Sequence, residues 1–169
     1  MIKRSLVIFL CFPAFCLFVV DATPFERSFS GICERVLDGD TIIVSGRRIR
    51  LKGIDAPESD QKSYDGFMIG LWSTKYLREM IEGKVVEVRW RTRGRYNRFI
   101  ADIYYQNRNI NHLMVREGMA MYYSFSKDTK LKAYQYEAQL LKKGIYGTFG
   151  FDRPSYFRRK KAASKSGLL

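Results

Sequence analysis

The chain has 169 residues, a length that fits one domain, and it shows no internal repeat that would indicate a second one. Its 30 Lys and Arg against 17 Asp and Glu give a net charge of +13, which favours binding to polyphosphates. Its one histidine excludes reactions that need two.

The first 22 residues have the pattern of a secretory signal peptide. Lys3 and Arg4 precede an uncharged apolar run over residues 6–20, and Val20-Asp21-Ala22 supplies a small-residue cleavage point. The run is shorter than the roughly 20 residues that a spanning helix needs. We therefore expect a secreted or cell-envelope (periplasmic) protein, with an uncleaved N-terminal membrane anchor as the alternative.

The rest of the chain divides into a polar leader at residues 23–30, a domain at 31–150 and a basic tail at 151–169 whose Ala-Ala-Ser-Lys-Ser-Gly end is expected to be disordered. Alternating or β-branched apolar residues predict strands at 32–37, 41–44, 49–54, 84–90 and 99–104. Apolar residues at helical spacing predict helices at 67–81, 109–117 and 128–143. Five strands and three helices suit an α+β fold, mainly a small antiparallel β barrel with helices packed on it.

Three residues in these elements have a structural rather than a catalytic interpretation. Cys33 lies in the first strand, where a buried small hydrophobe is expected rather than a nucleophile. Asn111 is expected to cap the second helix, and His112 beside it is expected on that helix's surface.

The first three strands form a meander with a tight turn at Asp38-Gly39-Asp40. Such a meander can bring Asp40 close to Asp55, at the end of the third strand. Arg50 alternates out of phase with the apolar Ile49 and Leu51, so it can face the same cleft.

Two carboxylates brought together repel each other unless something neutralises them, and a hard divalent cation with oxygen ligands commonly does so. An Asp-Gly-Asp turn or an Asp-Ala-Pro strand end alone is ordinary loop chemistry. Arg50 and Glu58, however, lie in the same stretch of sequence as these two motifs, and a second arginine motif follows at Arg98. The set favours an active site.

Four blocks in order resemble the staphylococcal nuclease-like (thermonuclease) family: V-L-D-G-D-T, I-R-L-K-G-I-D-A-P-E, G-R-Y-N-R-F-I-A-D-I-Y and N-H-L-M-V-R-E-G-M-A. The resemblance covers roughly residues 31–147. It implies an OB-fold, a five-stranded antiparallel barrel that hosts nucleic-acid sites on its face.

The resemblance also implies roles for individual residues. Asp40, Asp55 and the backbone carbonyl of Ala56 would bind Ca²⁺. Glu58 would orient or deprotonate the attacking water, and Arg50 and Arg98 would clamp the scissile phosphate. Arg95 and Tyr96 would contact a terminal phosphate or sugar, and Asp38 would fix the loop or lie in the outer shell of the site.

We therefore expect a calcium-dependent nuclease that hydrolyses phosphodiester bonds of DNA and RNA with low sequence specificity. The resemblance implies 3′-phosphate and 5′-hydroxyl products. A monomer without a stable protein partner is expected, with membrane contact only through an uncleaved N-terminus. One alternative is a noncatalytic nucleic-acid-binding module on the same fold. Another is a basic envelope protein that binds anionic lipid or polymer, which would explain the charge but not the carboxylates.

Overall fold

The computed structural model describes residues 27–94 and 98–166. The predictions for residues 1–22 and for Arg95 and Tyr96 lie outside the described residues. The domain boundary at residue 31 lies four residues inside the first strand, because β1 begins at Arg27. The end of the predicted leader is therefore strand, and it pairs antiparallel with β5 from Arg27 opposite Trp90 onward.

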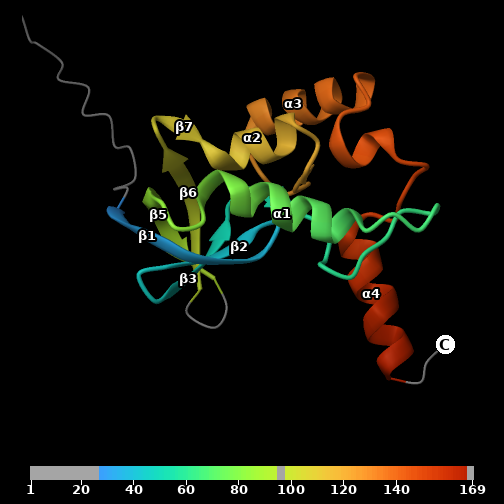
Figure 1. Ribbon diagram of the computed structural model, residues 1–169, viewed down its shortest axis with the longest axis horizontal. Coiled ribbons are helices and arrows are strands. Elements are labelled where there is room, and N and C mark those ends of the chain that lie inside the picture. Colours follow the sequence, from blue (N-terminus) through green and yellow to red (C-terminus); the bar gives the residue numbers. More distant parts are fainter. Residues whose placement is uncertain (1–26, 95–97, 167–169) are drawn as a thin grey trace, which may run out of the picture.

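Five strands close into a barrel (Figure 1) in the order β3-β2-β1-β5-β6, with β6 pairing back onto β3. They are β1 (Arg27–Asp38), β2 (Thr41–Val44), β3 (Arg47–Leu51), β5 (Val85–Arg93) and β6 (Phe99–Tyr105). This confirms the predicted α+β, OB-like barrel. Its closing pair, β3 with β6, is parallel, whereas the other pairs within the barrel are antiparallel.

Side chains that alternate along the strands fill the barrel. Ile49 and Leu51 of β3 are buried, and Phe99, Ala101 and Ile103 of β6 are buried beside them. Because successive side chains of a strand point to opposite faces, Arg50 is directed away from this core. The barrel thus provides a rigid frame for one arginine at its rim.

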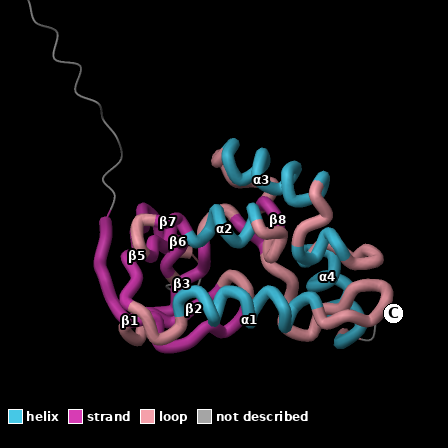
Figure 2. Tube along the Cα trace, turned by 45° about the horizontal axis from the view of Figure 1, so that its top comes forward, coloured by secondary structure: helices cyan, strands magenta, loops and turns pink. Residues whose placement is uncertain are grey.

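The fold also has four α-helices: α1 (Ile69–Ile81), α2 (Ile110–Arg116), α3 (Thr129–Leu140) and α4 (Pro154–Lys165). Helix α1 contacts β1, and α2 contacts both β6 and α3 (Figure 2). Short elements connect them: β4 (Ile54–Asp55), β7 (Arg108–Asn109), β8 (Met121–Tyr122) and the 3₁₀ helix η2 (Gly144–Gly147). No helix among the described residues is long and apolar enough to span a bilayer.

The predicted cap of α2 was wrong. Asn109 is the N-cap and accepts a hydrogen bond from the backbone N–H of His112. Asn111 is fully buried instead, where it accepts from the N–H of Ile103 and donates to the carbonyl of Ala101. A buried amide that satisfies strand backbone groups is costly to lose, so this position serves the core rather than the helix end.

The predicted disorder at the end of the tail was also wrong for the part that the structure describes. Residues 162–165 form the last turn of α4, a helix that begins with Pro154 at its first turn. Proline suits that position, and Arg, Lys and Ala are good helix formers. Figures 1 and 2 place α4 at the opposite end of the molecule from β5 and β7.

Candidate active site

The β2–β3 hairpin brings an arginine to the predicted carboxylates. Its register sets Arg50 opposite Thr41, the neighbour of Asp40. One arm of the Arg50 guanidinium, Nη1, donates to Asp40 Oδ1 at 2.5 Å, and the other, Nη2, donates to Asp55 Oδ1 at 3.1 Å. The meander therefore unites the three residues as the sequence predicted.

The turn before β2 is held from several directions. Asp38 Oδ1 accepts the backbone N–H of Asp40 at 2.9 Å, the loop-fixing role expected of Asp38. The backbone N–H of Ala56 donates to Asp40 Oδ2 at 3.0 Å. A side chain at Gly39 would overlap Ser73 of α1, so glycine allows the turn to lie directly on that helix. The site is thus anchored to the core.

Asp40 and Asp55 are buried charged groups, with exposed fractions of 2% and 5%. Burial raises the pKa of Asp40 to about 7, although the neighbouring Arg50 guanidinium opposes that rise. Such carboxylates need positive charge close to them to remain ionised.

The oxygen donors fit a hard cation. The two buried carboxylates lie beside Ala56, whose backbone carbonyl is the predicted third ligand, and such oxygens are what Ca²⁺ prefers. Within the described ranges, no group of three or more His, Cys, Asp or Glu is arranged to hold a metal ion. A cation held by Asp40 and Asp55 would share these carboxylates with Arg50.

Arg98 lies directly before β6, and the parallel pairing of β3 with β6 sets Arg50 opposite Ile100. Burial lowers the pKa of Arg98, and the positive charge of Arg50 lowers it further, whereas Asp40 opposes the shift. Its Nε is buried and, in the described part of the chain, has no hydrogen-bond partner. Two guanidinium groups at one rim, one with an unsatisfied donor, suit an oxyanion ligand.

Glu58 follows β4 and is held by a residue that the sequence did not single out. Arg158 of α4 donates from Nη1 to Glu58 Oε1 at 2.9 Å, and from Nη2 to Asp55 Oδ1 and Oδ2 at 2.9 and 3.2 Å. Burial alone would lower the pKa of Arg158, but its bonds to Glu58 and Asp55 raise it. The only sequence signal was the run Arg-Arg-Lys-Lys at 158–161, which does not say which cation reaches the site.

A cavity of about 210 Å³ opens beside Asp55 and Arg158. Its other walls are residues 121–125 and the start of α4 at 153–155. Tyr123 and Phe125 are exposed, 42% and 81%, and their rings lie 5.4 Å apart between centroids. An aromatic wall beside arginines is the arrangement on which nucleobases stack.

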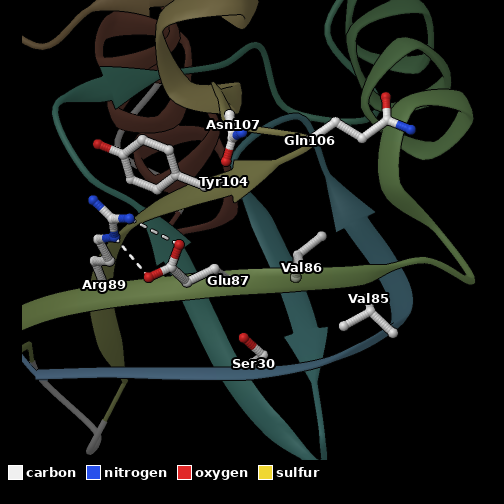
Figure 3. A pocket seen from close by; sticks show the side chains of 8 residues that line it. All are labelled: Ser30, Val85, Val86, Glu87, Arg89, Tyr104, Gln106 and Asn107. Atoms are coloured by element: carbon white, nitrogen blue, oxygen red, sulfur yellow. Dashed lines mark hydrogen bonds and ion pairs between the residues drawn. The ribbon is translucent and has the colours of Figure 1, made fainter.

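A second hollow, on the outer surface of the barrel, contains none of the predicted site residues (Figure 3). In it, Arg89 forms an ion pair with Glu87 and stacks over the ring of Tyr104 at 4.3 Å. These contacts give Arg89 and Glu87 a structural role.

A comparison with known proteins identifies the family. The family model described as staphylococcal nuclease homologue matches residues 48–148. The chain belongs to the staphylococcal nuclease family. An uncharacterized endonuclease of Escherichia coli is 38% identical over 133 residues, which cover 75% of this chain and 83% of that protein. A micrococcal nuclease of Shigella flexneri is 31% identical over 157 residues, covering 83% and 87%.

Membership in the staphylococcal nuclease family places the chain among nuclease hydrolases of phosphodiester bonds, with nucleic acid as substrate. The family match ends at residue 148, so it includes Arg50, Glu58 and Arg98 but not Arg158. The site described above therefore draws on a helix beyond the matched segment.

Proposed function

We propose that this chain is a calcium-dependent nuclease that hydrolyses DNA and RNA with low sequence specificity. The observation that carries the proposal is the meeting of Asp40, Arg50 and Asp55 at one rim of the barrel, with Glu58 joined to them through Arg158. A protein that only binds nucleic acid does not need acidic groups in its basic face, because each one repels phosphate.

Asp40, Asp55 and the carbonyl of Ala56 would hold the Ca²⁺. When bound, the ion supplies positive charge that neutralises the phosphate and lowers the pKa of a water molecule. The two carboxylates otherwise depend on arginine for compensation, so the same buried positions suit a divalent cation.

Glu58 orients the attacking water and accepts its proton at a carboxylate oxygen. Arg50 and Arg98 donate hydrogen bonds to the phosphate oxygens and stabilise the added charge of the five-coordinate transition state. A new bond forms between the water oxygen and phosphorus while the bond from phosphorus to the 5′ oxygen breaks. The phosphate then remains on the 3′ end, and the 5′ oxygen leaves as a hydroxyl after taking up a proton.

Low sequence specificity follows from the groups that make contact. Phosphate clamps read no base edges, and the exposed rings of Tyr123 and Phe125 would stack on any base. The net charge of +13, which becomes +12 when Lys3, Arg4 and Asp21 are removed with residues 1–22, would draw polyanions to the surface, and affinity would fall as salt rises. The enzyme would act on DNA and RNA as a monomer.

We also propose that residues 1–22 direct export and are removed. N-terminal sequencing of the protein from the cell envelope or medium tests this. A mature chain that begins at Thr23 supports a secreted or periplasmic enzyme, whereas an intact Met1 supports a membrane anchor.

Cleavage of single-stranded DNA and RNA with Ca²⁺ and with chelator tests the activity, using wild type, Glu58→Gln and a control, Glu79→Gln, on the exposed face of α1. We expect calcium-dependent cleavage that is lost in Glu58→Gln and kept in Glu79→Gln, while DNA binding persists in all three. Salt-sensitive binding without cleavage under any divalent cation would instead show a noncatalytic binding module.

A further inference from the structure

The C-terminal segment beyond the family match holds the loop that carries Glu58. Gln61 Nε2 donates to the carbonyl of Asp152 at 2.6 Å, and the Tyr64 hydroxyl donates to Asp152 Oδ1 at 2.9 Å. The backbone N–H of Tyr64 donates to the carbonyl of Gly150 at 2.8 Å. Lys161 of α4 forms an ion pair with Asp60. These contacts attach the loop to residues 150–161.

The main chain of Glu58 is fixed on its other side by α1. A side chain at Gly70 would overlap the carbonyl oxygen of Glu58, so the first turn of α1 lies directly against it. The backbone N–H of Glu58 donates to Oε1 of Gln61, a residue that is fully buried. The backbone position of Glu58 is therefore set without help from its own side chain.

The orientation of the Glu58 carboxylate, unlike that of its main chain, is set by a contact with α4. Its side chain is 35% exposed, and the loop around it has no regular secondary structure. One fork of Arg158 spans Glu58 and Asp55, so the guanidinium fixes the separation of the two carboxylates. A lysine has a single nitrogen at its tip and does not reproduce this planar, two-armed geometry.

We propose that Arg158 is a positioning residue that orients Glu58 for catalysis, which makes α4 part of the active site. The inference rests on the proposed nuclease function. A general base acts only when its oxygen lies within hydrogen-bond reach of the proton that it takes, so a partly exposed carboxylate on an irregular loop gains from a fixed partner. Arg158 supplies that partner from a helix outside the segment that the family model matches.

Helix α4 provides a matched control. Arg159 is the next residue and carries the same charge, but it is exposed and its guanidinium lies 5.9 Å from the ring centre of Tyr156. Arg159→Ala therefore removes the same charge from the same helix without touching Glu58. The test compares this variant with Arg158→Ala, Arg158→Lys, Glu58→Gln and the double variant Glu58→Gln/Arg158→Ala.

Cleavage of single-stranded DNA with Ca²⁺ is measured at steady state, and with excess enzyme for the slow variants. We expect Arg158→Ala to lower kcat by about 10- to 100-fold with KM changed by less than about threefold. Arg158→Lys should recover part of the loss, and Arg159→Ala should stay within about twofold of wild type. In the Glu58→Gln background, Arg158→Ala should cause almost no further loss, because the residue that it positions is already disabled.

Three results would overturn the proposal. If Arg158→Ala cleaves DNA at the wild-type rate or faster, Arg158 either is dispensable or blocks the binding of Ca²⁺. Calorimetric titration with Ca²⁺ separates the two, because tighter binding in the variant would show that Arg158 blocks the site. An equal loss in the wild-type and Glu58→Gln backgrounds would show a general structural role, which thermal unfolding of each variant checks. Wild-type protein without calcium-dependent cleavage, or a Glu58→Gln variant as fast as wild type, would refute the nuclease mechanism itself, and the role of Arg158 would fall with it.

Discussion

The β2–β3 hairpin and helix α4 supply arginines to the same carboxylates by different means. Arg50 is placed by strand pairing and a buried core, since Ile49 and Leu51 on either side of it are almost inaccessible to water. Within α4, Pro154 is the one buried residue, and the helix docks through ion pairs such as that of Lys161 with Asp60. The comparison indicates a rigid half of the site built into the barrel and a second half held by charge, which is sensitive to salt.

Removal of the hairpin arginine should have the largest effect. We expect Arg50→Ala to lower the cleavage rate by about 10²- to 10³-fold, because a phosphate donor is lost. Stability should fall by about 3 kcal/mol, because Asp40 would remain buried without its ion pair. Steady-state kinetics and urea unfolding measure the two effects.

The control for this variant is Arg48→Ala, an exposed position on the same strand. An Arg50→Ala protein as active and as stable as Arg48→Ala would remove the distinction between the two halves of the site.

The close packing of the barrel should also make the thiol of Cys33 slow to react. Burial, with a smaller contribution from Glu82, raises the pKa of Cys33 to about 11. Because the thiolate is the reactive form, the reactive fraction at pH 8 should be roughly 100-fold below that of an ordinary thiol, and burial slows access further. The rate is measured with a thiol reagent and absorbance on the chain from Thr23, which retains Cys33 and lacks Cys11 and Cys16, with the same protein unfolded in guanidinium as the reference. Fast labelling of the native protein would contradict a rigid barrel.

The junction between the two halves can be disturbed at Gly70. We expect Gly70→Ala to destabilise the protein by about 1–3 kcal/mol, because the added methyl group would displace the Glu58 carbonyl from α1. Cleavage should fall as Glu58 moves. Thermal unfolding and kinetics measure both effects, with Leu71→Ala on the exposed face of α1 as the control. A stable, fully active Gly70→Ala protein would show that the close contact is not required.

The smallest effect is expected at the surface contacts of α4. Lys161→Ala breaks an exposed ion pair with Asp60, so the loss of stability should be under about 1 kcal/mol. Cleavage should remain within about twofold of wild type and of Lys160→Ala, since Arg158 keeps its own partners. A loss as large as that of Arg158→Ala would mean that the docking of the whole helix, rather than one guanidinium, orients Glu58.

The same contrast explains what could be predicted from the sequence. The meeting of Asp40, Arg50 and Asp55 follows from short-range alternation and from turns, both of which are local properties of the chain. Arg98 could be placed only through the family resemblance, because its neighbours depend on the closure of the barrel by β3 and β6.

The contact of Arg158 with Glu58 could not be predicted, because 100 positions separate the two residues in the sequence. No local pattern indicates which side chain of a basic run contacts the site. Asn111 was misassigned for a related reason. Its partners at Ile103 and Ala101 lie on another element, and the preference of Asn for helix caps is a local rule that this tertiary contact overrides.

The central claim, that the barrel carboxylates form a calcium-dependent hydrolytic centre, is tested most directly by the cleavage rate of single-stranded DNA as a function of free Ca²⁺. The comparison uses wild type, Asp40→Asn and Asp102→Asn, which removes one carboxylate at a distance from the site, where Asp102 forms an ion pair with Lys52. We predict a rate that saturates with Ca²⁺ in wild type and Asp102→Asn and is abolished at all concentrations in Asp40→Asn, with DNA binding kept in all three. Cleavage by Asp40→Asn that equals the wild-type rate, or a wild-type rate that does not respond to Ca²⁺ or chelator, would contradict the account.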